Sequence, residues 1–205
     1  MHKNRMLTFD IKRFAPHLPI YAFAFVLVIG ILFGCVVVNK YEVLTQSCND
    51  FLKEYCEIRT NEYTFAKVYS SLLLWLPTYF VMFLLGVSAI GCVTSICILG
   101  YMGFCYGCIS GYLYSTFGLV GIVYSALVLV PSALLFLFGL IILSRESFRF
   151  SYLICNACIK NNKPQNLYSV FRQYCYKSCG LLLCPLVSVI FDIGISSIFL
   201  NYFSF

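Results

Sequence analysis

The chain has 205 residues, of which 61% are hydrophobic and 11% are charged, and its mean hydropathy is +0.88. This composition excludes an ordinary soluble domain, because soluble domains carry about 25% charged residues. The formal net charge of +6 lies in a few short segments, and no block of like charges has interleaved aromatic residues, so we expect no nucleic-acid binding. The length fits one compact helical bundle, which we treat as a single domain, residues 1–205.

The N-terminal segment, residues 1–18, is short and basic. Its cationic side chains are Lys3, Arg5, Lys12 and Arg13. Residues 19–38 carry no charge, and a transmembrane helix needs only about 20 apolar residues. The apolar core of a cleaved signal peptide has about 7–15 residues, so this longer run predicts an uncleaved first span.

The next segment, residues 39–67, has mixed charge and is expected to form an external loop. Its apolar positions recur at helical spacing: Leu44, Cys48, Phe51, Leu52 and Tyr55. The spacing predicts an amphipathic helix that lies at the membrane surface or packs on the bundle. On one straight helix Cys48 and Cys56 would be about 12 Å apart by rise, too far for a disulfide. An irregular loop would permit that bridge, so both states of the pair stay open.

Residues 68–144 contain no Asp, Glu, Lys, Arg or His. At about 20 residues per crossing, the stretch holds roughly three spans. We expect them at about 68–87, 92–114 and 119–143, with turns at 88–91 and 115–118. Pro131 interrupts the third span and predicts a kink, because proline removes a helical hydrogen bond and frees a carbonyl.

The C-terminal part begins with a basic segment, residues 145–178, and ends with an apolar run at about 179–201. A linker at 161–165 divides the basic segment into two helical pieces. Cytoplasmic segments of membrane proteins are enriched in Lys and Arg, so both basic segments should face the cytoplasm. The prediction is an all-α integral membrane protein: a five-helix transmembrane bundle with a cytoplasmic N-terminus and an extracytoplasmic C-terminus.

Four glycines in the second central span share one helix face, with spacings of three, four and four: Gly100, Gly103, Gly107 and Gly111. Small residues at this spacing let helix backbones approach closely in lipid. The face could pack inside the bundle or form an interface with a second copy or another protein. We favour packing inside the bundle, because Gly86, Gly91, Gly118 and Gly121 flank it.

Asp192 is the only acidic or basic residue inside a predicted span. A charge at bilayer depth is costly unless it is paired, protonated or wet, so the residue is a functional candidate. We favour a structural or partner contact over an ion relay, because no other predicted span offers an ionisable partner. Early termination of the last span, which would expose the carboxylate, remains the third alternative.

The twelve cysteines and two histidines suggest little catalytic chemistry. The candidates for a zinc site are Cys155, Cys158, Cys175 and Cys179. Such spacings also arise by chance in a cysteine-rich chain, and buried cysteines act as small hydrophobic residues. The sequence contains no Ser-His-Asp set, carboxylate pair or phosphate-binding loop. We therefore expect no metal, no cofactor and no enzymatic activity.

The chain resembles the stage II sporulation protein M family of bacterial membrane proteins. The resemblance rests on three stretches: Ile11-Lys12-Arg13 through Gly30–Gly34 to Val38-Asn39; Gly100–Gly118 continuing to Val130-Pro131-Ser132-Ala133; and Arg145–Ser151. It implies a scaffold of the engulfment machinery that works with the peptidoglycan-degrading stage II sporulation proteins D and P. It also implies a place in the bacterial cell membrane, at the septum or in the engulfing mother-cell membrane.

Two functions follow as hypotheses. The first is a non-enzymatic membrane scaffold that anchors or localises wall-degrading enzymes and contacts membrane lipid. The alternative is a small transporter or permease component, suggested by helices broken at Gly and Pro. A continuous polar cavity reaching Asp192 would favour the alternative.

Overall fold

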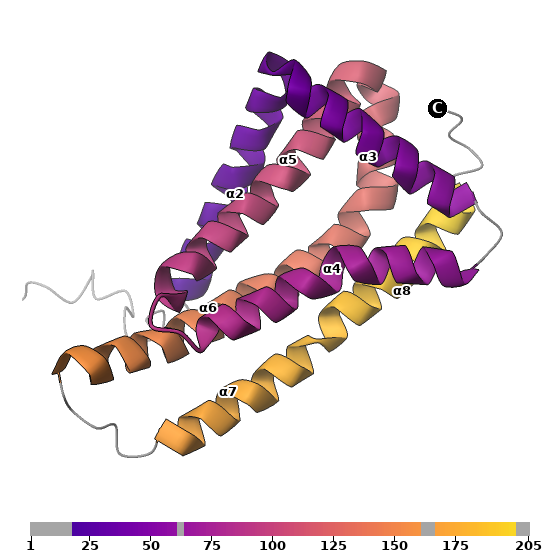
Figure 1. Ribbon diagram of the computed structural model, residues 1–205. Helices are drawn as coiled ribbons and strands as arrows, with labels where there is room; N and C mark the ends of the chain where they lie inside the picture. The colour runs from indigo at the N-terminus through magenta and orange to yellow at the C-terminus, as the bar shows by residue number, and fades with distance from the viewer. Residues whose placement is uncertain (1–17, 61–63, 161–166, 200–205) are drawn as a thin grey trace, which may run out of the picture.

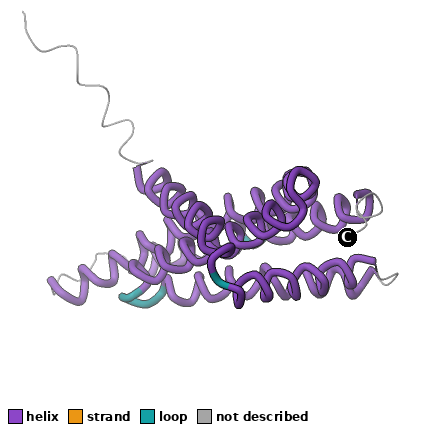
Figure 2. The backbone as a smooth tube through the Cα atoms, turned by 90° about the horizontal axis from the view of Figure 1, so that it is seen from above, coloured by secondary structure: helices purple, strands orange, loops and turns teal. Residues whose placement is uncertain are grey.

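The computed structural model describes residues 18–60, 64–160 and 167–199, and all regular structure in these ranges is helical (Figures 1 and 2). This confirms the all-α class. The elements are α2 (Leu18–Val37), η1 (Val38–Lys40), α3 (Glu42–Thr60), α4 (Thr64–Gly86), α5 (Gly91–Tyr124), η2 (Ser125–Leu129), α6 (Val130–Lys160), α7 (Leu167–Leu181) and α8 (Leu183–Phe199).

Four segments of the described chain are long and apolar enough to cross a membrane. They are Ile20–Lys40, Lys67–Gly86, Gly91–Asn156 and Tyr168–Ser196. The third segment folds back on itself, because α5 and α6 pass one another in opposite directions (Figure 1). The chain is therefore a membrane protein in which α2, α4, α5, α6 and α8 lie in alternating directions. Its orientation in the membrane remains a prediction.

The reversal between α5 and α6 occurs at Gly118, where φ is 58° and ψ is −130°. L-residues rarely adopt a positive φ of this kind, whereas glycine adopts it readily. Immediately after the reversal, the backbone at Gly121 packs against Leu113. A Cβ atom at Gly121 would lie 2.7 Å from the carbonyl carbon of Leu113. The predicted turn at 115–118 thus corresponds to a single non-helical residue with helix on both sides.

We expect the substitution Gly118→Ala to destabilise the protein by about 1–3 kcal/mol, through backbone strain alone. A Cβ atom at Gly118 would meet nothing within 4 Å, so no steric overlap contributes. Gly180→Ala in α7 is the matched control, because its Cβ also meets nothing and its φ is not positive. Thermal unfolding in detergent should show a lower midpoint for the first variant and an equal or higher one for the second. Equal shifts in both variants would contradict the strain argument.

A π-helical segment, η2, immediately precedes α6, whose second residue is Pro131. Proline cannot donate a backbone hydrogen bond, and π-turns accommodate such a break in the ladder. Two serines bind carbonyl groups at this point. Ser132 Oγ donates to the Leu129 carbonyl at 3.1 Å, and Ser188 Oγ of α8 donates to the Ser132 carbonyl at 2.7 Å. The irregular turn is therefore fixed to α8 by a buried hydrogen bond.

At the opposite end of α6, its polar extension packs against the turn between α4 and α5. Ser151 Oγ donates to the Ser88 carbonyl at 2.7 Å and accepts from the Cys92 amide at 3.0 Å. Tyr174 of α7 donates to the Phe83 carbonyl at 2.9 Å. The Ser151 bonds hold α6 against this turn beyond the end of the apolar run. The predicted linker at 161–165 lies outside the described residues.

Candidate functional site

The glycine face of α5 packs directly on α2, and the two helices lie side by side and parallel (Figure 1). Gly103 lies against the backbone of Leu27 and Ile31, and Gly107 lies against Ile31. One turn further on, Gly111 lies against Cys35, to whose Cα its Cβ would approach within 2.9 Å. Each step of four residues along α5 matches a step of four along α2, which establishes the parallel register.

The partner glycines of α5 are Gly30 and Gly34, which lie on the facing side of α2. A Cβ at Gly30 would lie 3.3 Å from the Gly103 carbonyl carbon, and one at Gly34 would lie 3.0 Å from the Gly107 Cα. Sequence reasoning did not assign this role to them, although Gly30-x-x-x-Gly34 has the required spacing.

Two thiols reinforce the contact reciprocally. Cys35 of α2 donates to the Gly107 carbonyl at 3.2 Å, and Cys108 of α5 donates to the Gly34 carbonyl at 3.7 Å. Gly100 differs from the other three glycines, because its Cβ would make only an ordinary contact with Val26, at 3.5 Å. It therefore lies at the margin of the close approach. Gly86 and Gly91, which flank the face in sequence, pack against Ser147 and Ser151 of α6.

Asp192 lies on α8, is 2% exposed and binds side chains from two other helices. One carboxylate oxygen accepts from Tyr55 of α3 at 2.6 Å. The other accepts from Ser71 of α4 at 3.0 Å and forms an ion pair with Arg59 of α3. Both carboxylate oxygens thus accept hydrogen bonds, and one is paired with a guanidinium, which removes much of the cost of burial.

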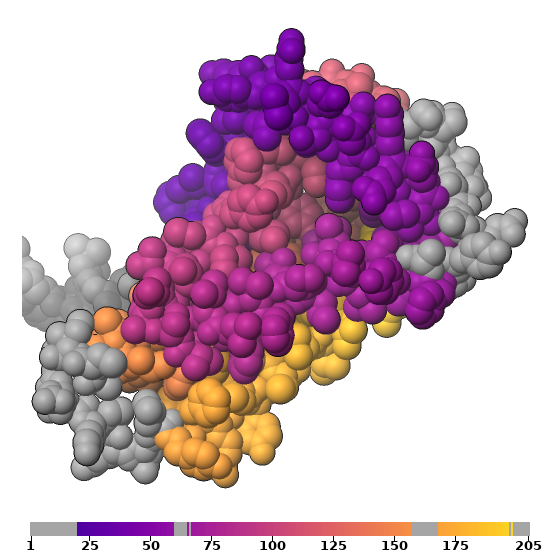
Figure 3. All heavy atoms as spheres, viewed as in Figure 1, coloured from indigo at the N-terminus to yellow at the C-terminus, as the bar shows by residue number. Residues whose placement is uncertain are grey.

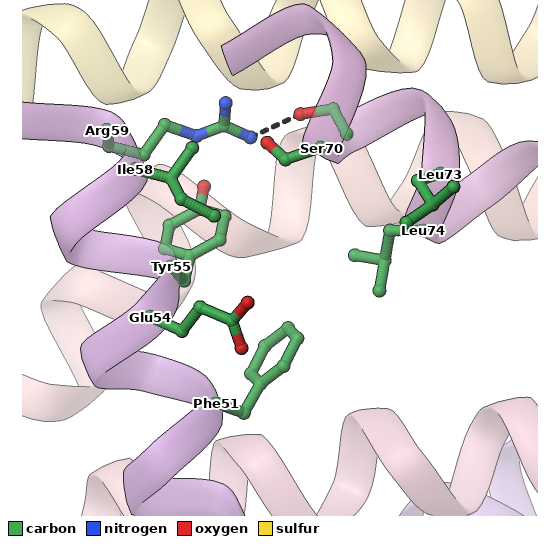
Figure 4. A pocket seen from close by; sticks show the side chains of 9 residues that line it. Phe51, Glu54, Tyr55, Ile58, Arg59, Ser70, Leu73 and Leu74 are labelled. Atoms are coloured by element: carbon green, nitrogen blue, oxygen red, sulfur yellow. Dashed lines mark hydrogen bonds between the residues drawn. The ribbon is translucent and has the colours of Figure 1, made fainter. Parts of the chain in front are cut away.

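Arg59 is the residue of this buried cluster that sequence reasoning missed. It lies near the end of α3, in a segment expected to be external, yet it is only 5% exposed. Its guanidinium donates to the Lys67 carbonyl at 3.1 Å and to Ser71 Oγ, and it lies over the Tyr55 ring at 4.8 Å from the ring centroid. Figure 4 shows Tyr55 and Arg59 projecting from α3 toward the start of α4. The only sequence signal was a lone arginine on the apolar side of an amphipathic helix.

The helix α3 reaches this position because its apolar face packs on the bundle. Cys48 and Leu52 are buried in one core cluster with Val38 and Tyr112. Burial and the nearby Asp192 carboxylate raise the pKa of Tyr55 well above its usual value, so the phenol stays protonated and donates its hydrogen bond. Cys48 and Cys56 are free thiols on this one helix.

A cavity of about 510 Å³ lies next to the ion pair, between α3, α4, α5 and η2. Figure 3 shows the hollow, with α3 on one side and α4 on the other. Apolar and aromatic side chains dominate its wall, including Leu74, Trp75, Met102, Phe104 and Ile109. Asp192 is at its polar end, so the cavity is continuous with the site but is not a polar pathway.

The candidate zinc cysteines lie on two helices near the linker. Cys155 lies on α6, and Cys175 and Cys179 lie on α7. The side chain of Cys158 lies outside the described residues. Within the part of the chain that the structure describes, no group of three or more His, Cys, Asp or Glu side chains could hold a metal ion.

A family model matches the chain, whereas the other comparisons do not. No curated protein and no solved structure matches the chain significantly. The sequence model described as "Stage II sporulation protein M" matches residues 23–196, a range that extends from α2 into α8 and includes the glycine interface, Arg59 and Asp192. This match covers most of the chain and agrees with the resemblance noted in the sequence. The chain therefore belongs to the stage II sporulation protein M family and is a sporulation membrane protein.

Proposed function

We propose that this protein is a non-enzymatic scaffold that anchors or localises peptidoglycan-degrading enzymes at the septal and engulfing membrane. Its partners would be the stage II sporulation proteins D and P. The family consists of generally non-catalytic membrane proteins, which agrees with this role. In this proposal the membrane bundle is the anchor, and α3 is the part that meets the partners.

The fixed position of α3 is the observation that supports the proposal most strongly. Arg59 and Tyr55 bind Asp192, while Cys48 and Leu52 are buried against α5, so the helix lies firmly on the bundle. Its opposite face is exposed and charged. The exposed polar residues on this face include Gln46, Asp50, Lys53, Glu54 and Glu57. A rigid charged surface is suited to selective protein binding, since complementary charge gives specificity and fixes register.

The proposed orientation places α3 outside the cell, where peptidoglycan lies. The basic residues of the α6 extension and α7 lie at the opposite end of the bundle from α3 (Figure 1). They include Arg149, Arg172 and Lys177, and such residues mark the cytoplasmic side. The transporter alternative receives no support from the cavity, because its wall is mainly apolar and the charge of Asp192 is already paired with Arg59.

Co-purification from sporulating membranes tests the proposal. The tagged wild-type protein should capture the stage II proteins D and P. A variant with Asp50→Lys and Glu54→Lys, both exposed on α3, should lose most of this capture. The matched control is Arg172→Glu, an exposed charge reversal on α7, which should capture the partners normally. A wild-type protein that captures no wall-degrading enzyme would refute the partner assignment, and equal losses in both variants would refute the role of α3.

A further inference from the structure

We propose that the cavity beside the Arg59–Asp192 pair binds an acyl chain of a membrane phospholipid. The proposal starts from the size of the cavity. Ligand pockets in proteins have volumes of about 300–1,000 Å³, and this cavity measures about 510 Å³. Some of its lining side chains are exposed, so it is a groove that a ligand can enter from outside the bundle.

The chemistry of the wall favours an apolar occupant over water. The polar groups near the cavity are already bound to protein: the Asp192 carboxylate accepts from Tyr55 and Ser71, and Ser132 Oγ donates to the Leu129 carbonyl. Cavity water requires about two to four hydrogen-bond partners. The indole nitrogen of Trp75 and the hydroxyl of Tyr106 also belong to lining residues, but each exposes less than 1 Å² and offers water no contact.

The mouth of the cavity faces the surroundings of the bundle. Tyr101 of α5 and Leu74 of α4 line the cavity and are 61% and 43% exposed. Both lie within segments that are long and apolar enough to cross the membrane. The opening therefore lies between α3 and these two spans, on the side of the bundle where α4 and α5 border the hydrocarbon. An acyl chain can enter there without leaving an apolar medium, whereas a soluble ligand would have to cross one.

Trp75 is a built-in probe for this occupant, because it is the only tryptophan in the sequence. It lines the cavity and is 8% exposed, so bulk lipid touches little of its side chain. Bromine atoms on an acyl chain quench tryptophan fluorescence at close range. We would reconstitute the protein in vesicles of phosphatidylglycerol and phosphatidylethanolamine, with or without brominated acyl chains, and measure Trp75 emission.

Two variants on α5 make a matched pair. Cys105→Phe adds a ring at the cavity wall, whereas Cys97→Phe adds the same ring at an exposed position outside the cavity. Brominated lipid should remove most of the fluorescence of the wild-type protein and of Cys97→Phe, and only a small part in Cys105→Phe. Leu129→Phe fills the same cavity from η2 and serves as a second filling variant, with thermal unfolding to verify that each variant folds.

Each other outcome overturns the proposal. Strong quenching in both filling variants would show that bulk lipid reaches the indole without using the cavity. Weak quenching in the wild-type protein would show that the cavity holds water or a protein segment. This result needs only the wild-type protein, so it stands even if the variants do not fold. If Cys105→Phe lowers the capture of a protein partner while wild-type quenching is weak, the occupant is that partner's apolar segment.

Discussion

Asp192→Ala should destabilise the protein by about 3–5 kcal/mol, because it leaves the Arg59 guanidinium buried without its counter-ion. The side chain of Arg59 is almost wholly inaccessible, so solvent cannot replace the lost carboxylate. Removing both charges should be much less damaging: a protein with Arg59→Met and Asp192→Leu should recover most of the lost stability. Reversible unfolding of Arg59→Met, Asp192→Leu and the double variant, measured in mixed micelles, would give the coupling energy of the pair.

A second ion pair provides the comparison for this cycle. Lys177 and Glu146 are 2.8 Å apart, but the lysine side chain is 49% exposed. The Glu146 side chain is only 10% exposed, so this half-exposed pair lies between a fully exposed pair, which contributes about 0–1 kcal/mol, and a buried one. Lys177→Ala should therefore cost less stability than Asp192→Ala. A coupling energy for Arg59 and Asp192 no larger than that for the half-exposed pair would contradict the structural role of the buried pair. Limited proteolysis within residues 42–60 should also be faster in Asp192→Ala, because α3 loses its attachment to α8.

Gly107→Ala should be strongly destabilising, although alanine is the better helix former. The added Cβ would overlap the carbonyl oxygen of Ile31 and lie 2.8 Å from its carbonyl carbon. All of these atoms belong to the backbone of α2, so relief requires the two helices to separate. Overpacking of a well-packed core costs about 1–3 kcal/mol and sometimes more. Gly107→Leu should prevent correct folding altogether, which expression level and gel filtration of the membrane extract would show.

Gly100→Ala is the control on the same face of the same helix. Its Cβ would make an ordinary contact with a flexible side chain, and alanine is favoured over glycine within a helix by about 1 kcal/mol. We therefore expect unchanged or slightly higher stability. If both alanine variants behave alike, the contact between α2 and α5 is looser than the geometry indicates.

The sequence was sufficient to predict the class of protein, because hydropathy and charge report what lipid requires. The charge-free run at 68–144 predicted membrane-spanning helices, and the apolar spacing in 39–67 predicted the helix now seen as α3. The glycines of α5 also indicated close packing before the partner helix was known. Each of these features is a pattern among residues close together in the sequence, so the sequence alone is enough to predict it.

The assembly of the buried pair could not be predicted in the same way. Arg59 and Asp192 are 133 positions apart, and the residues around each of them give no indication that the two side chains form a pair. The arginine belongs to a segment rich in charges, where a single buried cation has no distinctive signal. The continuity of α6 was also not predicted. The sequence indicated a span that ends near residue 143 and a separate helical piece before the linker, whereas one helix continues to Lys160, with Ser147 and Ser151 bound to carbonyl groups of the α4–α5 region. Such contacts depend on tertiary packing.

The parallel packing of α2 and α5 has a consequence for how the protein is inserted into the membrane. Two spans can be parallel only if the chain crosses back an odd number of times between them, and here α4 provides that single return. If α3 crossed the membrane as well, α5 would be inverted, and the paired glycines could not meet in register. During synthesis α2 is made before α5, so its glycines have no helix to pack against until α5 is inserted. The charges of α3 keep that helix out of the hydrocarbon, and this allows α5 to lie parallel to α2 and pack on it.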